Sequence, residues 1–194
     1  DLKNLHVIKL IQQDSENFGK LFTITRGIEA GKNDSCITNV YNDYKLLRGE
    51  DVTAFNIDFK NLYVEYNSTE TSKFKPASTY EGEKILIRRV GNELISAYDN
   101  ENYLNLNTIY NCKPLKKNVN LFYITALLNS SLLKNWFKKV FVLTDRLFPY
   151  VRISQLEYIP IKFADDEEFK FEILTKYIMF SINRLNYISK FIIS

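Results

Sequence analysis

Histidine and cysteine are scarce in this chain, and their scarcity argues against a metal centre. The 194 residues include one histidine, His6, and two cysteines, Cys36 and Cys112, which form no CxxC pair. A zinc site needs several such ligands at short, regular spacings, so the sequence does not support one. Isolated cysteines in a reducing compartment are usually small core residues, and His6 lies in an apolar helical pattern where a packed or half-exposed imidazole is expected.

Long apolar runs are also missing. No segment stays apolar for the roughly 20 residues that a membrane helix requires, and residues 1–10 lack the charged-then-apolar order of a secretion signal. We therefore expect a cytoplasmic location. Glycine and proline are few, but a hydrophobic share of 45% and an aromatic share of 14% are enough to build a folded core in one domain.

The segment with most glycine near the start, GIEAGKNDSCIT at residues 27–38, lacks the pattern of a nucleotide phosphate loop. Such a loop has the order GxxxxGK[ST] and opens a helix. Here Lys32 is followed by Asn33 and then by a β-like sequence, which excludes that loop. Gly27 and Gly31 nevertheless permit backbone conformations closed to other residues, and Lys32 and Asn33 offer hydrogen-bond donors.

The net charge of +3 is small but unevenly placed. Residues 73–117 contain eight basic and five acidic side chains, so the whole excess lies in this stretch. Lysines and arginines that meet phosphates release counterions, and a polyanion-binding face could arise in this way. The alternative is a solvated surface with alternating charges.

The hydrophobic pattern predicts short strands between helical ends. Apolar residues at a spacing of three predict a helix over residues 2–13, and Gly91 with Asn92 reads as the turn of a hairpin. The β-branched and aromatic runs that predict strands are residues 20–25, 36–40, 61–66, 83–90, 93–98 and 103–112.

The pattern changes to a helical one after residue 118. Steps of three and four predict a single core helix over residues 118–140, with Asn118 or Asn120 as its N-cap. A second helix of about 30 residues is predicted from Asp165, which has capping-box spacing with Glu168. Its apolar stripe needs a partner: this domain, another part of the same polypeptide, or a second protein.

Five segments in order resemble successive blocks of the TaqI-like C-terminal specificity domain. They span about Gly19 to Ile161 and read GKLFTITRGIEAGKNDSCIT, YKLLRGEDV, EKILIRRVGNELISAYDNENYLNLNTIYNC, FYITALLNSSLLKNWF and FPYVRISQLEYIPI. This family provides the target-recognition module of type IIG restriction-modification enzymes and related adenine-specific DNA methyltransferases. It is similar to the recognition domains of type I specificity subunits.

The resemblance implies an α+β fold with a β-rich target-recognition body, built on a twisted, partly barrel-like sheet, together with a packed core helix and a long C-terminal helix. It divides the chain into an N-terminal helix and lead-in at 1–18, a DNA target-recognition domain at 19–163 and a spacer-like helix at 164–194. The glycine-rich turn would belong to the recognition body, with Gly27 and Gly31 setting its shape.

The resemblance also indicates which side chains would meet double-stranded DNA. Asparagine can bond adenine through two atoms and arginine can bond guanine likewise, whereas lysines mainly contact phosphates. The expected base-reading residues are Asn33, Arg48, Arg88, Arg89 and Asn107. The expected DNA-positioning residues are Lys32, Lys73, Lys75, Lys113, Lys116 and Lys117, and Arg26 completes the DNA-binding set.

Arg88 and Arg89 are adjacent on a predicted strand, so their side chains should point to opposite faces. At most one of them is then expected to face the DNA directly. The other would form a salt bridge to Glu83 or Asp99.

No catalytic or metal-binding residue is expected in this chain. An adenine methyltransferase needs a tetrapeptide of the NPPY kind, which is absent from the sequence. Formal matches to a metal-dependent nuclease, Asp51 with Asp58-x-Lys60 and the triplet Glu168-x-Lys170, are short enough to arise by chance in a lysine-rich chain. We expect the chain alone neither to methylate nor to cleave.

The expected function is therefore sequence-specific DNA binding within a type IIG-like restriction-modification enzyme. The domain would direct an adenine-N6 methyltransferase, and an endonuclease where one exists, located elsewhere in the full-length protein. S-adenosylmethionine and Mg²⁺ would serve only those domains. Two alternatives remain: a type I specificity-subunit-like protein with a separate methyltransferase subunit, and a non-catalytic adaptor that uses the C-terminal helix.

Overall fold

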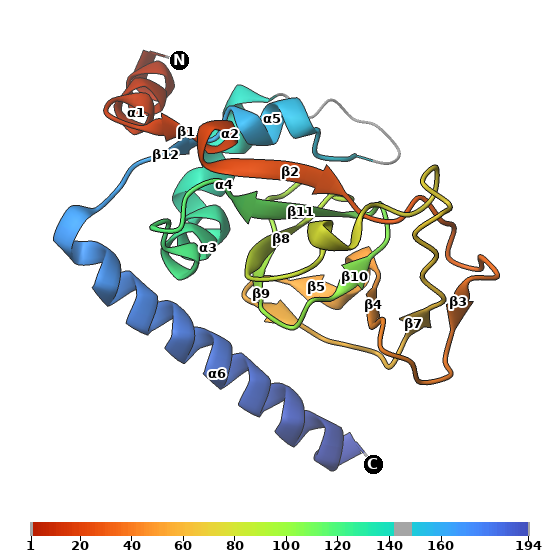
Figure 1. Ribbon diagram of the computed structural model, residues 1–194. Coiled ribbons are helices and arrows are strands. Elements are labelled where there is room, and N and C mark those ends of the chain that lie inside the picture. Colours follow the sequence, from red (N-terminus) through yellow and green to blue (C-terminus); the bar gives the residue numbers. More distant parts are fainter. Residues whose placement is uncertain (1, 142–148, 194) are drawn as a thin grey trace.

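A computed structural model describes residues 2–141 and 149–193. Its centre is a four-stranded antiparallel sheet in the order β2-β11-β8-β9 (Figure 1). These strands are β2 (Phe22–Arg26), β8 (Lys84–Arg88), β9 (Ser96–Asp99) and β11 (Ile109–Pro114). The predicted hairpin is confirmed: β8 pairs with β9, and Gly91 has a φ of 130°, which favours glycine.

Four two-stranded ladders surround this sheet in the described part of the chain. The expected strand at 103–112 is divided into β10 and β11 by a turn at residues 106–108. The ladders are β1 (Glu16–Asn17) with β12 (Pro160–Ile161), β3 (Ile37–Thr38) with β7 (Tyr63–Val64), β4 (Leu46–Leu47) with β10 (Leu104–Asn105), and β5 (Val52–Thr53) with β6 (Asn56–Ile57). Of these four ladders in the described residues, the β4–β10 ladder is parallel and the other three are antiparallel.

Two helices cover one face of the sheet, α3 (Leu121–Asn129) and α4 (Ser131–Val140). The prediction of one continuous helix here is wrong, because Ser130 is extended with a ψ of 148°. Its hydroxyl accepts a hydrogen bond from the Leu133 N–H (3.2 Å), so Ser130 is the N-cap of a new helix. Asn120 caps α3 by accepting the Tyr123 N–H (3.1 Å), as predicted.

Asn129 joins α3 to the sheet. Its Oδ1 accepts the Ser96 N–H (3.0 Å), and its Nδ2 donates to the Ser96 carbonyl (2.9 Å) and to the Thr125 carbonyl (3.0 Å). All these groups are buried. A single amide therefore fixes both the end of α3 and the start of β9.

The main core lies between the sheet and its helices. Trp136 and Phe137 of α4 pack with Tyr110 of β11 and with Phe18 from α2 (Phe18–Leu21), and α5 (Ile153–Glu157) closes the same side. Cys112 lies in this core, as expected. A second cluster, built around Leu46, Val64, Phe74 and Tyr80, fills an outer lobe that carries β3 and β7 (Figure 1). Two 3₁₀ turns, Gly49–Asp51 and Ala77–Thr79, complete the body.

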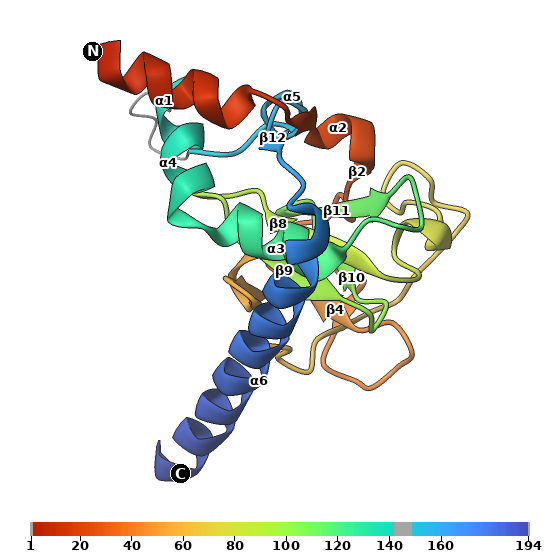
Figure 2. The ribbon, with the colours of Figure 1, turned by 90° about the vertical axis from the view of Figure 1, so that its left-hand side faces the viewer.

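Helices also occupy both ends of the chain. α1 (Leu2–Gln12) is confirmed. α6 (Glu168–Ile193) follows a 3₁₀ turn at Asp165–Glu167, and its C-terminal end lies away from the body (Figures 1 and 2). Within the described residues, no helix carries an apolar stretch that could cross a bilayer.

The first half of α6 packs on α3. The Phe171 ring lies 5.5 Å from the Tyr123 ring, Asn120 Nδ2 donates to Glu172 (2.9 Å), and Lys176 Nζ lies 4.6 Å from the ring of Phe122. Many large apolar side chains of α6 nevertheless remain exposed. They include Leu174, Tyr177, Phe180, Leu185, Ile188 and Ile192.

Candidate nucleic-acid interface

Three arginines gather at the end of the sheet where β2 and β8 finish. Arg26 is the last residue of β2, and Arg89 follows β8. The segment 149–152 joins β8 at this point, because the Val151 N–H donates to the Arg89 carbonyl (2.8 Å) and Val90 pairs with Tyr150. Arg152 is therefore held near Arg89, and Arg89 and Arg26 both lie near Tyr110 of β11. We call Arg26, Arg89 and Arg152 the arginine cluster.

Two tyrosines lie among these arginines. The Tyr150 ring is 5.2 Å from the Arg89 guanidinium carbon and 5.9 Å from that of Arg152, within cation–π range. Tyr110 is buried and its hydroxyl donates to the Val151 carbonyl (2.8 Å). Burial raises the pKa of Tyr110, and the nearby Arg89 and Arg26 oppose that rise.

The charge of the arginine cluster is not neutralised by the described residues. None of its members forms an ion pair with a carboxylate in the parts of the chain that the structure describes. Arg26 and Arg152 are exposed and Arg89 is half-buried. Within the described residues, this end of the sheet therefore carries positive charge that can attract an anion.

A cavity of about 450 Å³ opens beside the arginine cluster. It is lined by residues 29–32, by Arg48 and Glu50, and by the turn at residues 106–108. Arg89 links the two features, because its Nη1 donates to the Asn107 carbonyl (3.2 Å). We call this space the recognition cavity.

Polar side chains of the recognition cavity are already paired with one another. Lys32 Nζ lies 2.9 Å from Glu50 Oε1, and both side chains are exposed. Burial acts to raise the pKa of Glu50, but the hydrogen bond from Lys32, a main-chain hydrogen bond and the positive charges of Lys32 and Arg48 together lower it. Arg48 Nη2 donates to the Lys32 carbonyl (3.2 Å), and Asn107 Nδ2 donates to Glu29 Oε2 (2.6 Å). Exposed pairs of this kind are weak and can be exchanged for other partners.

Gly27 allows the segment at 27–32 to approach the 105–107 backbone. A Cβ atom at Gly27 would lie 2.1 Å from the Asn105 carbonyl oxygen. This close approach accompanies two main-chain hydrogen bonds, from Ile28 N–H to Asn105 O (2.7 Å) and from Asn107 N–H to Ile28 O (2.8 Å). Gly31 has open space around it and no positive φ, so of the two glycines in this segment the structure requires glycine at Gly27 and not at Gly31.

The structure brings half of the predicted DNA-binding set together. Lys32, Arg48 and Asn107 line the recognition cavity, Asn33 follows Lys32, and Arg26 and Arg89 belong to the arginine cluster. The salt bridge expected for Arg88 or Arg89 is wrong. Glu83 accepts from the Tyr98 hydroxyl and Asp99 pairs with buried Lys84 (2.5 Å), while Arg88 Nε bonds the Val90 carbonyl (3.0 Å).

The other predicted residues lie elsewhere. Lys113 is near the far end of β11, where it pairs with Thr23 and donates to the Ser78 carbonyl (2.7 Å). Lys116 and Lys117 follow that end and are exposed. Lys73 and Lys75 belong to the outer lobe. The charge excess of residues 73–117 is therefore divided among separate surfaces.

Sequence reasoning missed Tyr150, Arg152 and Glu29. Tyr150 and Arg152 stand in the quoted FPYVRISQLEYIPI block, but their role depends on β pairing with Val90 and Arg89, some sixty residues earlier in the chain. Glu29 belongs to the site because its carboxylate accepts a hydrogen bond from Asn107, a contact that the sequence does not indicate. The basic and aromatic neighbours at 150–152 were the available signal.

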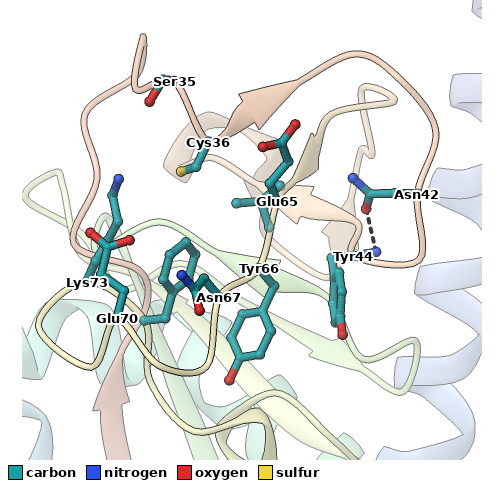
Figure 3. Close-up of a pocket in the computed structure, with 11 residues that line it drawn as sticks. Ser35, Cys36, Asn42, Tyr44, Glu65, Tyr66, Asn67, Glu70 and Lys73 are labelled. Atoms are coloured by element: carbon teal, nitrogen blue, oxygen red, sulfur yellow. Dashed lines mark hydrogen bonds between the residues drawn. The ribbon is translucent and has the colours of Figure 1, made fainter.

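A second cavity, of about 610 Å³, lies in the outer lobe (Figure 3). Its wall includes Tyr44 and Tyr66, whose rings are 5.1 Å apart, and Glu65 and Glu70 are exposed around it. Lys73, which lines it, is held by Asp34 (2.7 Å). Phosphate would meet two carboxylates here, so this cavity is less suited to DNA than the recognition cavity.

The candidate nucleophile Cys36 and the acidic residues of the formal nuclease matches have structural surroundings. Burial raises the pKa of Cys36 to about 11, which keeps the thiol protonated at neutral pH. Asp51 accepts the Arg48 N–H (2.7 Å), Asp58 pairs with Lys60, and Lys170 pairs with Glu167 (2.7 Å). Among the described residues, no three His, Cys, Asp or Glu side chains are grouped so that they could hold a metal ion.

The family model of the TaqI-like C-terminal specificity domain matches residues 44–161, which is more than half of the chain. The chain belongs to this family. It is thus a DNA sequence-recognition domain of the kind found in restriction-modification systems. The match begins after Gly27 and the 29–32 segment, and it includes Arg48, Asn107 and Arg152. No functionally curated protein matches the chain.

Solved specificity subunits share the fold. The S subunit of a type I restriction-modification system from M. genitalium has 17% identity and a TM-score of 0.54, with 91% of this chain and 40% of that chain covered. The HsdS subunit from Thermoanaerobacter tengcongensis has 12% identity and a TM-score of 0.54, with 94% and 44% covered.

A third structure, from work on assembly and conformational transition of the type I system, has 12% identity and a TM-score of 0.59, with 94% of this chain and 46% of that chain covered. The chain thus spans less than half the length of these solved chains.

Proposed function

We propose that this domain binds double-stranded DNA with the arginine cluster on phosphates and the recognition cavity at base edges. The observation that carries the proposal is the arginine cluster, whose positive charge has no described carboxylate partner. The adjacent cavity adds Asn107 and Arg48, the two side-chain types that bond adenine and guanine through paired contacts. Phosphate contacts and base contacts would thus come from neighbouring elements.

Salt dependence tests this proposal. Fluorescence anisotropy would follow binding of the chain to a mixed-sequence duplex at several salt concentrations. Each phosphate contact contributes a slope of about −0.9 in log K against log salt, so Arg26→Ala, Arg89→Ala and Arg152→Ala should each make the slope shallower by roughly that amount. Lys170→Ala on α6, which removes an exposed cation paired with Glu167, serves as the control and should leave the slope unchanged. Equal slopes for all four variants and the parent would contradict the proposal.

The finer function we propose is to direct an adenine-N6 DNA methyltransferase to its site. The methyltransferase, and an endonuclease where one exists, would lie elsewhere in a type IIG-like polypeptide. S-adenosylmethionine and Mg²⁺ would bind those catalytic domains. The family match supports this reading, since the family is named for the specificity domain of a TaqI-like enzyme.

A type I arrangement, with the methyltransferase as a separate subunit, is the second candidate. Two observations favour it: the solved structures of similar fold include type I S subunits, and α6 exposes Tyr177, Leu185 and Ile188 beyond its contact with α3. An exposed apolar helix face of this kind is suited to pairing with another helix.

Co-expression separates the two arrangements. The chain would be produced with the methyltransferase polypeptide encoded beside it, and the complex would be measured by size-exclusion chromatography with light scattering. A separate-subunit arrangement predicts a stable complex that Leu185→Asp disrupts and Lys170→Ala does not. If the same reading frame encodes a cofactor-binding methyltransferase upstream of Asp1, the single-polypeptide arrangement is correct instead.

A further inference from the structure

Two hydrogen bonds hold the main chain of Asn107, one at its N–H and one at its carbonyl. Its N–H donates to the Ile28 carbonyl (2.8 Å), and its carbonyl accepts from Arg89 Nη1 (3.2 Å). It stands in the turn between β10 and β11, half-buried in the wall of the recognition cavity. Its side chain is therefore presented from a fixed backbone.

The amide of Asn107 is also oriented. Nδ2 donates to Glu29 Oε2 at 2.6 Å, a short bond to an ionised acceptor. The reverse orientation of the amide would place Oδ1 against the carboxylate, where two acceptors repel. Glu29 therefore selects one orientation and leaves one N–H and the Oδ1 atom of Asn107 for a ligand.

That remaining pair of groups matches adenine. In the major groove adenine presents the N7 acceptor and the N6 amino donor side by side, and an asparagine amide bonds both when its N–H and its oxygen point outward together. Guanine presents two acceptors at the same edge, N7 and O6. An amide fixed in this way could donate to one of them, but its oxygen would face the other acceptor.

We propose that Glu29 is a positioning residue for base recognition: it holds the Asn107 amide in the orientation that reads one adenine of the target. This inference rests on the proposed DNA-binding function and adds to it the base that is read and the residue that sets the choice. Glu29 acts through Asn107 and does not itself contact the DNA.

Glu50 supplies a matched control. It is a second exposed carboxylate in the wall of the same cavity, but it pairs with Lys32 rather than with Asn107. Glu29→Gln and Glu50→Gln remove the same charge from the same cavity, so both should change overall DNA affinity alike. Only Glu29→Gln allows the amide of Asn107 to turn, because a glutamine side chain can donate to Oδ1 as well as accept from Nδ2.

The experiment is selection from a randomised duplex library with the whole chain, followed by sequencing of the bound DNA. The parent protein should enrich a sequence with at least one adenine that Asn107→Ala no longer requires. Glu29→Gln should reduce the preference at that same position by roughly tenfold to a hundredfold, with other positions and the salt slope unchanged. Glu50→Gln should change overall affinity, as Glu29→Gln does, but should keep the adenine preference at that position. Thermal melting should show that all variants remain folded.

Two results would overturn the inference while leaving DNA recognition in place. One is a Glu29→Gln protein that keeps the adenine preference which Asn107→Ala loses. The other is an Asn107→Ala protein with an unchanged sequence preference. Failure of the parent chain to bind the library at low salt would instead overturn the proposed function, and the inference with it.

Discussion

At several positions of this domain, contacts with residues far away in the sequence determine which residue type can be accommodated. Gly27 is the clearest example, because the Asn105 carbonyl occupies the space where a side chain would begin. The contact aligns Ile28 with Asn107 and so supports one wall of the recognition cavity. A glycine that looks like a turn residue in the sequence is in fact a close-packing residue.

Gly27→Ala should therefore destabilise the chain, whereas Gly31→Ala should not. Overpacking against backbone typically costs on the order of 1–3 kcal/mol, and the Asn105 carbonyl has little freedom to move. Gly31 has open space and no positive φ. Thermal or urea unfolding of the two variants measures the difference. Equal stabilities would show that the 27–32 segment shifts freely and does not position Asn107.

A second residue-scale prediction concerns acid. A hydrogen bond from Lys73, helped by the Cys36 N–H, holds the pKa of Asp34 at about 2, below its ordinary 3.8. Since the folded-state pKa is depressed, the stabilisation is complete above about pH 4 and is lost as the pH falls toward 2.

In Lys73→Met the Asp34 carboxyl should titrate at higher pH, though still below 3.8 because the Cys36 hydrogen bond remains (3.1 Å). Carboxyl carbon NMR shifts measure this titration directly. A midpoint near 2 in Lys73→Met would show that Lys73 is not the cause.

At the scale of elements, the sequence predicted the helices and strands whose positions depend on the short-range spacing of apolar residues. The positions of α1, α6 and the β8–β9 hairpin follow from apolar spacing and from the turn at Gly91, and all three are confirmed. The break at Ser130 was missed because the apolar spacing continues through it. The place of Arg152 beside Arg89 was missed for another reason: it depends on the pairing of Tyr150 with Val90, a long-range contact that local periodicity does not indicate.

Among the contacts between elements, the hydrogen bonds of Asn129 that join α3 to the sheet should contribute most to the free energy of unfolding. Asn129→Ala leaves the buried Ser96 N–H without its partner, and an unsatisfied buried group costs about 1–3 kcal/mol. Asn135→Ala, at an exposed position of α4, is the matched control. Denaturant unfolding should show the loss for Asn129→Ala alone. Two equally stable variants would mean that α3 is held by apolar packing only.

On the scale of the whole molecule, the first half of α6 packs on the body, and the second half exposes large apolar side chains. Its contacts with α3 involve Phe171, Glu172 and Lys176, all in its first three turns. Its last turns expose Leu185, Ile188 and Ile192.

A chain that ends after Asn186 should therefore keep its melting temperature within about 2 °C, because loss of exposed surface changes stability little. It should also weaken binding to a partner that contacts Ile188 and Ile192, since Leu174, Tyr177 and Leu185 stay in place. Differential scanning calorimetry and size-exclusion chromatography measure the two effects. A large fall in melting temperature would show that the end of α6 supports the body.

The pairing of β1 with β12 has a consequence for how such a domain can change. Glu16 lies opposite Ile161, so the polypeptide enters and leaves the body through two adjacent strands. The recognition cavity and the arginine cluster both lie in the part of the chain between these two strands. A body of different sequence and size that kept the β1–β12 pair and the face of α3 that holds α6 could replace this one without moving the flanking helices.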